Sequence, residues 1–136
     1  MPNTTTLSIE IDPVGWQRPG QGRYGNRYTE SKTATFQEQI RLAWRSQSGK
    51  KADGPIAVSL FLAFRMPKSW SKKKKESMAG KPMTSKPDAD NVAKSILDAL
   101  NKKAWEDDAQ VYKVFVTKVW GWEPCITVTI RGDQHE

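Results

Sequence analysis

Residues 56–64 read IAVSLFLAF, an almost unbroken apolar run with the length of one strand. Such a run is typical of a strand that is covered on both faces or lies centrally in its sheet, because apolar side chains then point to both sides of the pleat. A turn-like stretch ending at Pro55 precedes the run, and Pro67 follows it. We therefore predict that Ile56–Phe64 is the core strand of the fold.

Shorter strands are predicted on both sides of this run. Leu7–Ile11 alternates apolar with polar residues and ends before Pro13, which is the period of a strand with one buried face. Val111–Trp120 and Cys125–Arg131 are also strand-like. Residues 121–124 contain the Gly and Pro expected in a tight connection, and we expect them to join the last two strands as a hairpin.

Large apolar residues recur at every fourth position over residues 33–47, which predicts a first amphipathic helix. Trp44 is expected to pack in the core as part of this pattern. A capping box of Thr35 with Glu38 is one possible start. Ser31 or Thr33 would begin the helix earlier.

A second amphipathic helix is predicted over Asn91–Asn101, with Asp90 or Asn91 as its N-cap. The order strand, helix, strand, helix, strand, strand indicates an α+β fold, with a small mixed β-sheet and two main helices packed on it. A length of 136 residues is that of one domain, so residues 1–136 are expected to form a single unit.

The charge of the chain favours a polyanionic partner. There are 22 Lys and Arg against 15 Asp and Glu, and the sequence pI is about 9.6. Nucleic acid or an anionic membrane surface would fit this excess. No apolar run approaches the ~20 residues of a spanning helix, and the N-terminus lacks the basic start and apolar stretch of an export signal. We expect a cytoplasmic protein that binds no membrane.

Neither Cys125 nor His135 is expected to carry chemistry. Cys125 is the single cysteine, so it has no partner in the chain for a disulfide, and its strand-like surroundings predict a small core residue. His135 is the single histidine and lies at the end of the chain. Histidine-based catalysis is therefore not expected.

Two basic segments are candidates for contacting nucleic acid. Residues 17–27 combine three glycines with three arginines, which fits either a solvated surface loop or a phosphate-contacting one. Residues 67–87 are predicted to be a long loop that is mobile until a ligand orders it. This loop has a run of four lysines suited to phosphate contact and, next to it, a tryptophan that can stack on an unpaired base. The candidate DNA-binding residues are Arg18, Arg23, Arg27, Lys68, Trp70, Lys72, Lys73, Lys74, Lys75 and Lys86.

Three aspartates stand close together in this otherwise basic chain. Asp88 and Asp90 are two residues apart at the start of the second predicted helix, so in extended backbone both side chains point to one side. Folding that helix back on the next strand can bring Asp108 to the same place. Hard oxygen ligands without clustered His or Cys favour Mg²⁺ or Mn²⁺ over zinc.

A divalent cation held by carboxylates beside a phosphodiester supports hydrolysis, because it activates a water and neutralises charge on the phosphate. Lys94, one helical turn after Asp90, can offer a further cation to the phosphate or to the leaving group. Asp98, one more turn along, can hold Lys94 by an i,i+4 ion pair. This is the pattern of a hydrolytic nuclease.

Plainer interpretations of the same residues remain open. Asp90 can simply cap the helix, which stabilises it by about 1 kcal/mol. Asp107 and Asp108 can be ordinary turn residues before a strand. Lys94 and Asp98 can be an exposed pair worth a few tenths of a kcal/mol.

The motif is similar to that of the RusA family of Holliday-junction resolvases. The resemblance covers most of the chain and lies in KPDADNVAK at 86–94, LDALN at 97–101 and WEDDAQV at 105–111. Residues 67–74, PKSWSKKK, and the early segments Arg18-Pro19 and Tyr28-Thr29 also resemble the family. One position departs from it, since Lys102 stands where relatives often place a glycine. Because Asn101 tolerates a left-handed conformation, the turn is expected to survive.

Carried over to this chain, the resemblance implies that Asp88, Asp90 and Asp108 are the catalytic and metal-binding carboxylates and Lys94 the catalytic lysine. It leaves the role of Asp107 open. It also implies a RusA-like mixed α/β fold, a homodimer, two sites that cut opposed strands of a four-way junction, dependence on Mg²⁺ or Mn²⁺, and frequent origin in phages and prophages.

The leading hypothesis is thus a Mg²⁺-dependent crossover junction endodeoxyribonuclease that acts on branched DNA in recombination and repair, as a homodimer and without a small-molecule cofactor. One alternative is a non-catalytic basic nucleic-acid-binding module whose acidic residues only cap and turn. Another is a metal-dependent nuclease without junction preference. Metal-dependent strand cleavage distinguishes the first alternative, and comparison of junction with linear duplex distinguishes the second.

Overall fold

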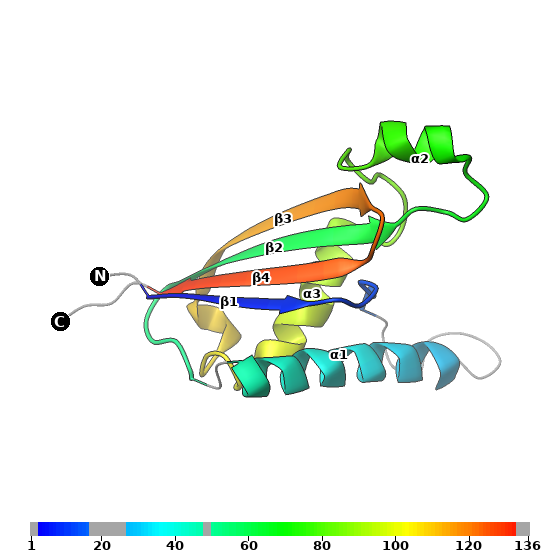
Figure 1. Ribbon diagram of the computed structural model, residues 1–136. Coiled ribbons are helices and arrows are strands. Elements are labelled where there is room, and N and C mark those ends of the chain that lie inside the picture. The colour runs from blue at the N-terminus through cyan, green and yellow to red at the C-terminus, as the bar shows by residue number, and fades with distance from the viewer. Residues whose placement is uncertain (1–2, 17–26, 48–49, 133–136) are drawn as a thin grey trace.

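The computed structural model describes residues 3–16, 27–47 and 50–132, with Asn3 and residues 27–31 described by their backbone alone. Its centre is a four-stranded sheet with the strand order β1-β4-β2-β3 (Figure 1). The strands are β1 (Asn3–Ile9), β2 (Ile56–Arg65), β3 (Val111–Gly121) and β4 (Cys125–Gly132). All four predicted strands are therefore present.

The sheet is mixed, as predicted. β2 runs parallel to β3 and antiparallel to β4, and β4 runs antiparallel to β1. The hairpin predicted for residues 121–124 is wrong, because β2 lies between β3 and β4. The apolar β2 takes an inner position with its parallel neighbour on one side, and the chain leaving β3 passes over the end of β2 to place β4 on the other side.

The helices are α1 (Arg27–Gln47), α2 (Lys72–Met78) and α3 (Ala89–Leu100). α1 and α3 cover one face of the sheet, as expected for an α+β domain, whereas α2 projects beyond the ends of β2 and β3 (Figure 1). α1 begins at Arg27, before every predicted start, so the proposed capping box at Thr35 and the starts at Ser31 and Thr33 are wrong. Thr33 lies inside the helix, and its hydroxyl donates to the Gly15 carbonyl at 3.3 Å.

Alternate residues of β2 point into the core beneath the helices. Val58, Leu60 and Leu62 are at most 2% exposed. The opposite face is not covered by a helix, and Phe61 on that face is 44% exposed. Of the two expectations for this strand, the inner position is confirmed and burial on both faces is wrong. Cys125, predicted as a core residue, is only half-buried.

Hydrogen bonds from α1 fix the position of α3. Gln37 Nε2 donates to the Ser95 carbonyl at 3.0 Å, and Arg41 Nε donates to the Ala99 carbonyl at 3.1 Å. Trp44, which is buried as predicted, continues the series just beyond the end of α3 by donating from Nε1 to a backbone carbonyl. Donors one helical turn apart thus meet acceptors one turn apart, which holds the two helices in register.

The segment predicted as a loop at 67–87 contains a helix. Ser71 is the N-cap of α2, and its side chain accepts from the Lys74 amide at 3.1 Å. A run of lysines and serine without apolar periodicity gave no sign of it. After α2 the chain runs antiparallel beside β3, with the Trp120 amide donating to the Lys81 carbonyl at 3.0 Å and the Met83 amide donating to β3 at 3.0 Å.

Candidate active site

The site begins at the N-terminus of α3. The helix starts at Ala89, so the N-cap is Asp88 and not Asp90 or Asn91 as predicted. Asp88 has the extended backbone of an N-cap, yet its side chain makes no capping hydrogen bond. Its Oδ2 instead lies 3.0 Å from Lys86 Nζ in an exposed ion pair. Such pairs contribute about 1 kcal/mol or less, so this carboxylate is readily available to another cation.

Asp90 lies in the first turn of α3 and is exposed. A negative charge here is favourable because the helix N-terminus carries partial positive charge from free backbone N–H groups. The predicted capping role is not found. Asp88 and Asp90 therefore both stand at the positive end of α3, with neither carboxylate used to cap it.

The second acidic position lies at a short 3₁₀ helix that begins at Asp108. Asp107 is its N-cap and accepts from the Ala109 amide at 3.0 Å, while Gln110 completes a capping box. Asp108 is turned differently, and its Oδ1 accepts from Trp105 Nε1 at 2.7 Å. The turn role expected for both aspartates therefore belongs to Asp107, whereas the Asp108 carboxylate is oriented by a fully buried tryptophan.

The segment that carries Asp108 is fastened to the residues before β2. Gln110 Nε2 donates to the Gly54 carbonyl at 3.0 Å. Lys51 Nζ lies 2.7 Å from Glu106 Oε2, and this hydrogen bond holds the pKa of Glu106 below its usual value. Glu106 and Gln110, on either side of Asp108, are thus both bound to residues that precede β2.

Asp98, further along α3, is influenced by the charges of Lys94 and Asp108. Burial raises the pKa of Asp98 above its usual value, the positive charge of Lys94 opposes that shift, and the negative charge of Asp108 adds to it. Charges influence each other in this way only across short distances. Lys94 and Asp108 are thus both close enough to Asp98 to change its pKa, and whether Asp108 joins Asp88 and Asp90 in one site stays a prediction.

Lys94 has an aromatic partner that sequence reasoning missed. Its Nζ lies 4.6 Å from the centroid of the Trp16 ring, within the range of a cation–π contact. The Trp16 amide donates to the Asn91 carbonyl at 3.0 Å, which ties residue 16 to the first turn of α3. Trp16 follows the predicted end of the first strand, and no spacing in the sequence connects it to position 94.

The three predicted metal ligands do not form a ready-made cluster. Within the ranges that the structure describes, no three His, Cys, Asp or Glu side chains lie in an arrangement that would hold a metal ion. Asp88 and Asp90 share the start of α3, and Asp108 is associated with Asp98 further along the helix.

The chain matches the family described as "Endodeoxyribonuclease RusA" over residues 10–131. It belongs to the RusA endodeoxyribonuclease family. A relative from Bacillus subtilis (strain 168), named "Uncharacterized protein YqaN", is 35% identical over 133 residues, which is 92% of this chain and 94% of the relative. The α+β fold, with a mixed sheet and helices on one face, is in keeping with the RusA family.

The residue with a left-handed backbone after α3 is Lys102 and not Asn101, which was expected from the sequence to take that conformation. Asn101 has φ −58°, whereas Lys102, which stands where relatives often have glycine, has φ +69°. The turn after α3 survives the substitution, but the lysine itself adopts the left-handed conformation. That conformation costs an L-residue roughly 1–2 kcal/mol.

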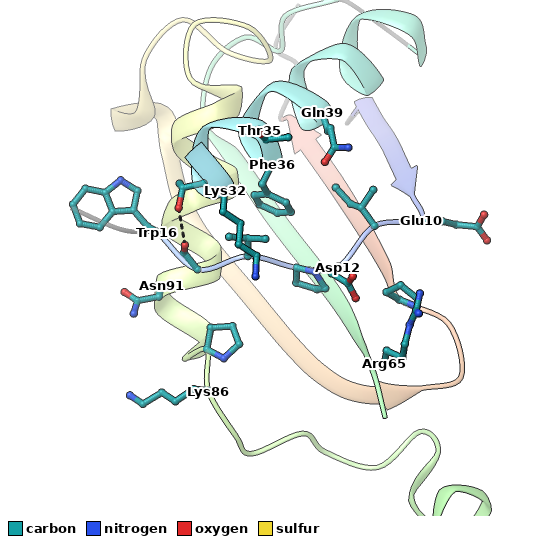
Figure 2. Close-up of a pocket in the computed structure, with 17 residues that line it drawn as sticks. Glu10, Asp12, Trp16, Lys32, Thr35, Phe36, Gln39, Arg65, Lys86 and Asn91 are labelled. Atoms are coloured by element: carbon teal, nitrogen blue, oxygen red, sulfur yellow. Dashed lines mark hydrogen bonds between the residues drawn. The ribbon is translucent and has the colours of Figure 1, made fainter. Parts of the chain in front are cut away.

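A groove of about 1160 Å³ opens beside the N-terminus of α3 in this RusA chain. Figure 2 shows Trp16, Asn91 and Lys86 on the side of α3, and Glu10 and Arg65 toward the other end. Lys32 and Asp12 also contribute charges to the lining. The groove borders the start of α3 rather than enclosing the aspartates, and its charges are of both signs.

The candidate DNA-binding residues of the RusA chain are only partly described. Arg18 and Arg23 lie outside the described residues, and only the backbone of Arg27 is described, at the start of α1. The remaining candidates surround α2 or precede α3. Lys68, Lys72, Lys73, Lys74 and Lys86 are exposed, and Lys75 and Trp70 are half-buried.

The Trp70 ring has two partners within the fold. Its ring meets Trp120 edge to face, with the centroids 5.0 Å apart, and Lys74 Nζ lies 4.4 Å from its centroid. Trp120 is buried. Trp70 thus anchors the base of α2 to β3.

Among the described residues, no helix has both the length and the apolar character needed to cross a membrane.

Proposed function

We propose that this protein is a divalent-metal-dependent endodeoxyribonuclease that resolves four-way DNA junctions by paired phosphodiester hydrolysis, with Mg²⁺ as the ion and Mn²⁺ as a substitute. The proposal is supported by the RusA family of the chain and by the placement of Asp88, Asp90 and Lys94 along the first turns of α3, with Asp108 close enough to influence the pKa of Asp98 on the same helix. Resolution of branched DNA in recombination and repair, in a bacterial or prophage setting and in the cytoplasm, is the proposed role.

The donor set fits a hard divalent cation in its chemistry. All the candidate ligands are carboxylates. Asp88 occupies an N-cap position without capping, and among the described residues its partner is the exposed Lys86. Asp108 has one oxygen bound by Trp105, which orients the carboxylate and leaves the second oxygen for another partner. Since the three carboxylates do not converge by themselves, ion binding has to draw them together.

When bound, the ion supplies Lewis-acid activation of water and neutralises charge on the phosphate. The residues of the chain do the rest. Asp88, Asp90 and Asp108 would hold the ion, and Lys94 would offer a cation to the scissile phosphate or to the leaving oxygen. The Trp16 ring restrains the Lys94 side chain on one side, which reduces the conformational freedom lost when the ammonium meets the phosphate.

DNA capture is assigned in this proposal to the lysines of α2, with Lys68 and Lys86. α2 has no buried residue and carries four consecutive lysines, an arrangement that suits sequence-independent contact with phosphates. Two such chains related by a two-fold axis would place two sites on opposed strands of a symmetric junction, and a closed symmetric dimer is the simplest assembly that does so.

Cleavage of a labelled four-way junction in Mg²⁺ tests this function. The parent protein should make paired symmetric nicks, and Asp90→Asn should bind the junction in Ca²⁺ or EDTA but not cut it. Asp53→Asn is the control for the loss of one exposed carboxylate, because Asp53 is exposed and is not one of the proposed ligands. It should cut like the parent.

Other outcomes would favour other functions. If purified parent protein binds the junction but never cuts it in Mg²⁺ or Mn²⁺, the protein is a nucleic-acid-binding module and the proposal fails. If it cuts linear duplex as fast as the junction, it is a metal-dependent nuclease without junction preference. Sedimentation of the parent with and without junction tests the homodimer.

A further inference from the structure

Lys118, on the edge strand β3, makes two short hydrogen bonds to the segment that precedes Asp88. Its Nζ donates to the Ser85 carbonyl at 2.8 Å and to the Pro87 carbonyl at 2.6 Å. The ammonium also lies 5.7 Å from the centroid of the Phe64 ring, on the neighbouring strand β2. Three donors on one ammonium allow one side chain to hold two carbonyls at once.

These bonds continue a line of contacts between the chain and β3. The Gly80 amide donates to the Trp120 carbonyl at 2.8 Å, and the Met83 amide donates to the Lys118 carbonyl at 3.0 Å. After Met83 the backbone ladder stops. Within the part of the chain that the structure describes, the hydrogen bonds that tie Ser85 and Pro87 to the sheet come from the Lys118 side chain.

The bond to Pro87 bears directly on Asp88. The Pro87 carbonyl belongs to the planar peptide unit that ends at the Cα of Asp88. Holding that oxygen therefore fixes the plane from which the Asp88 backbone starts and α3 begins. A group that orients metal ligands without touching the metal typically changes metal affinity by about 10- to 100-fold when removed.

We propose that Lys118 is a positioning residue, which clamps the Ser85 and Pro87 carbonyls so that Asp88 and Asp90 are presented together to the divalent cation. The proposal rests on the proposed function, since it names what holds the first two ligands of that site. Lys118 itself touches neither metal nor DNA, and its role is to limit how far the start of α3 can move.

Direct measurement of Mn²⁺ binding tests the proposal without relying on cleavage. The free-ion EPR signal is followed as Mn²⁺ is added to full-length parent, Lys118→Met and Lys118→Arg. Lys118→Met should weaken Mn²⁺ binding by about 10- to 100-fold. Lys118→Arg keeps donors for the carbonyls and should recover part of the loss. Junction binding in EDTA should be unchanged in both variants.

Lys113→Met is the matched control. Lys113 lies on the same strand, is exposed, and has its ammonium 5.7 Å from the Phe115 ring centroid. Its replacement should leave Mn²⁺ affinity at the parent value. Circular dichroism and thermal unfolding of each variant show whether the fold is kept. If Lys118→Met does not fold, Lys118→Gln, which can still donate to one carbonyl, takes its place.

Asp88→Asn in the same titration separates this inference from the function on which it rests. If Asp88→Asn loses Mn²⁺ binding while folded Lys118→Met binds like the parent, the clamp is overturned and the metal site stands. If Asp88→Asn itself binds Mn²⁺ like the parent, the metal site is wrong. A loss in Lys118→Met that Lys118→Arg does not recover at all would also overturn the clamp.

Discussion

α3 and α2 are both reached from β2 before the chain enters β3, yet their surroundings are opposite. α3 buries six of its residues and accepts hydrogen bonds from α1 along its length. α2 buries none and is held at its base, where Trp70 meets Trp120. One helix is part of the core, and the other projects from it (Figure 1).

The difference corresponds to two physical demands. Ligands and a cation that act on one phosphate must be held within a fraction of an ångström, which requires a packed support. Contacts to phosphates along a DNA arm act through charge, and their energy depends far less on exact placement. The proposed chemistry thus sits on the rigid helix, and the proposed DNA contacts sit on the projecting one.

The largest effect is expected from Lys94→Met, which removes charge from the rigid helix. Because the ammonium is proposed to stabilise the transition state, cleavage in Mg²⁺ should fall by about 10²- to 10³-fold, and junction affinity should change little. Single-turnover cleavage at saturating protein measures this. Lys103 is an exposed lysine after α3, and Lys103→Met should keep the parent rate. An equal loss of rate in Lys103→Met would contradict a specific role for Lys94.

The reverse result is expected for α2. Replacing Lys72, Lys73 and Lys74 with alanine should lower junction affinity and reduce the slope of log K against log salt by about 2 to 3 units. The single-turnover rate at saturation should stay near the parent value. Binding at several salt concentrations measures the slope. A large drop in the saturated rate with an unchanged slope would reverse the roles of the two helices.

Lys102→Gly tests the end of the rigid helix. Lys102 has φ +69°, which glycine adopts without the steric cost that a lysine incurs. The variant should raise the free energy of unfolding by about 1 kcal/mol, less the greater entropy of glycine in the unfolded chain. Urea unfolding measures this change. A destabilised variant would show that the Lys102 side chain contributes more than its backbone strain costs.

The smallest effect concerns Asp98 in metal-free protein. Because burial and the charge of Asp108 raise its pKa in the folded state, its contribution to stability is greatest below the unfolded value near 3.8 and is lost as pH rises through the folded pKa. Asp98→Asn should remove this decline. Solvent screening limits the difference at neutral pH to a few tenths of a kcal/mol, and urea unfolding in EDTA across pH 3–7 detects it. An unchanged pH profile would contradict the coupling.

Periodicity was sufficient for the elements that build the rigid region. The alternation in β1 and β4 and the apolar stripe of α3 each record burial that the structure reproduces, and the apolar run of β2 indicated its inner position but not the exposure of its second face. Strand order was not predictable in this way. The turn at residues 121–124 has the same local composition whether it joins neighbouring strands or passes over β2, because sheet order depends on contacts between distant segments.

The aspartates of the site are visible in sequence because they share one short motif. Their supports are not. Trp16 and Lys118 act through side chains that meet Lys94 and the segment before α3 only after folding. α2 was missed for a different reason, since a helix without a buried face has no apolar period to detect.

The attachment of α2 has a consequence for how such chains diverge. The segments before and after α2 both contact β3, and no residue of α2 is buried in the core. Insertions or deletions within it would thus change the size of the proposed DNA-binding surface while α3 and the sheet keep their packing. Helices of other lengths could therefore replace α2 and alter the choice of substrate without changing the residues proposed for catalysis.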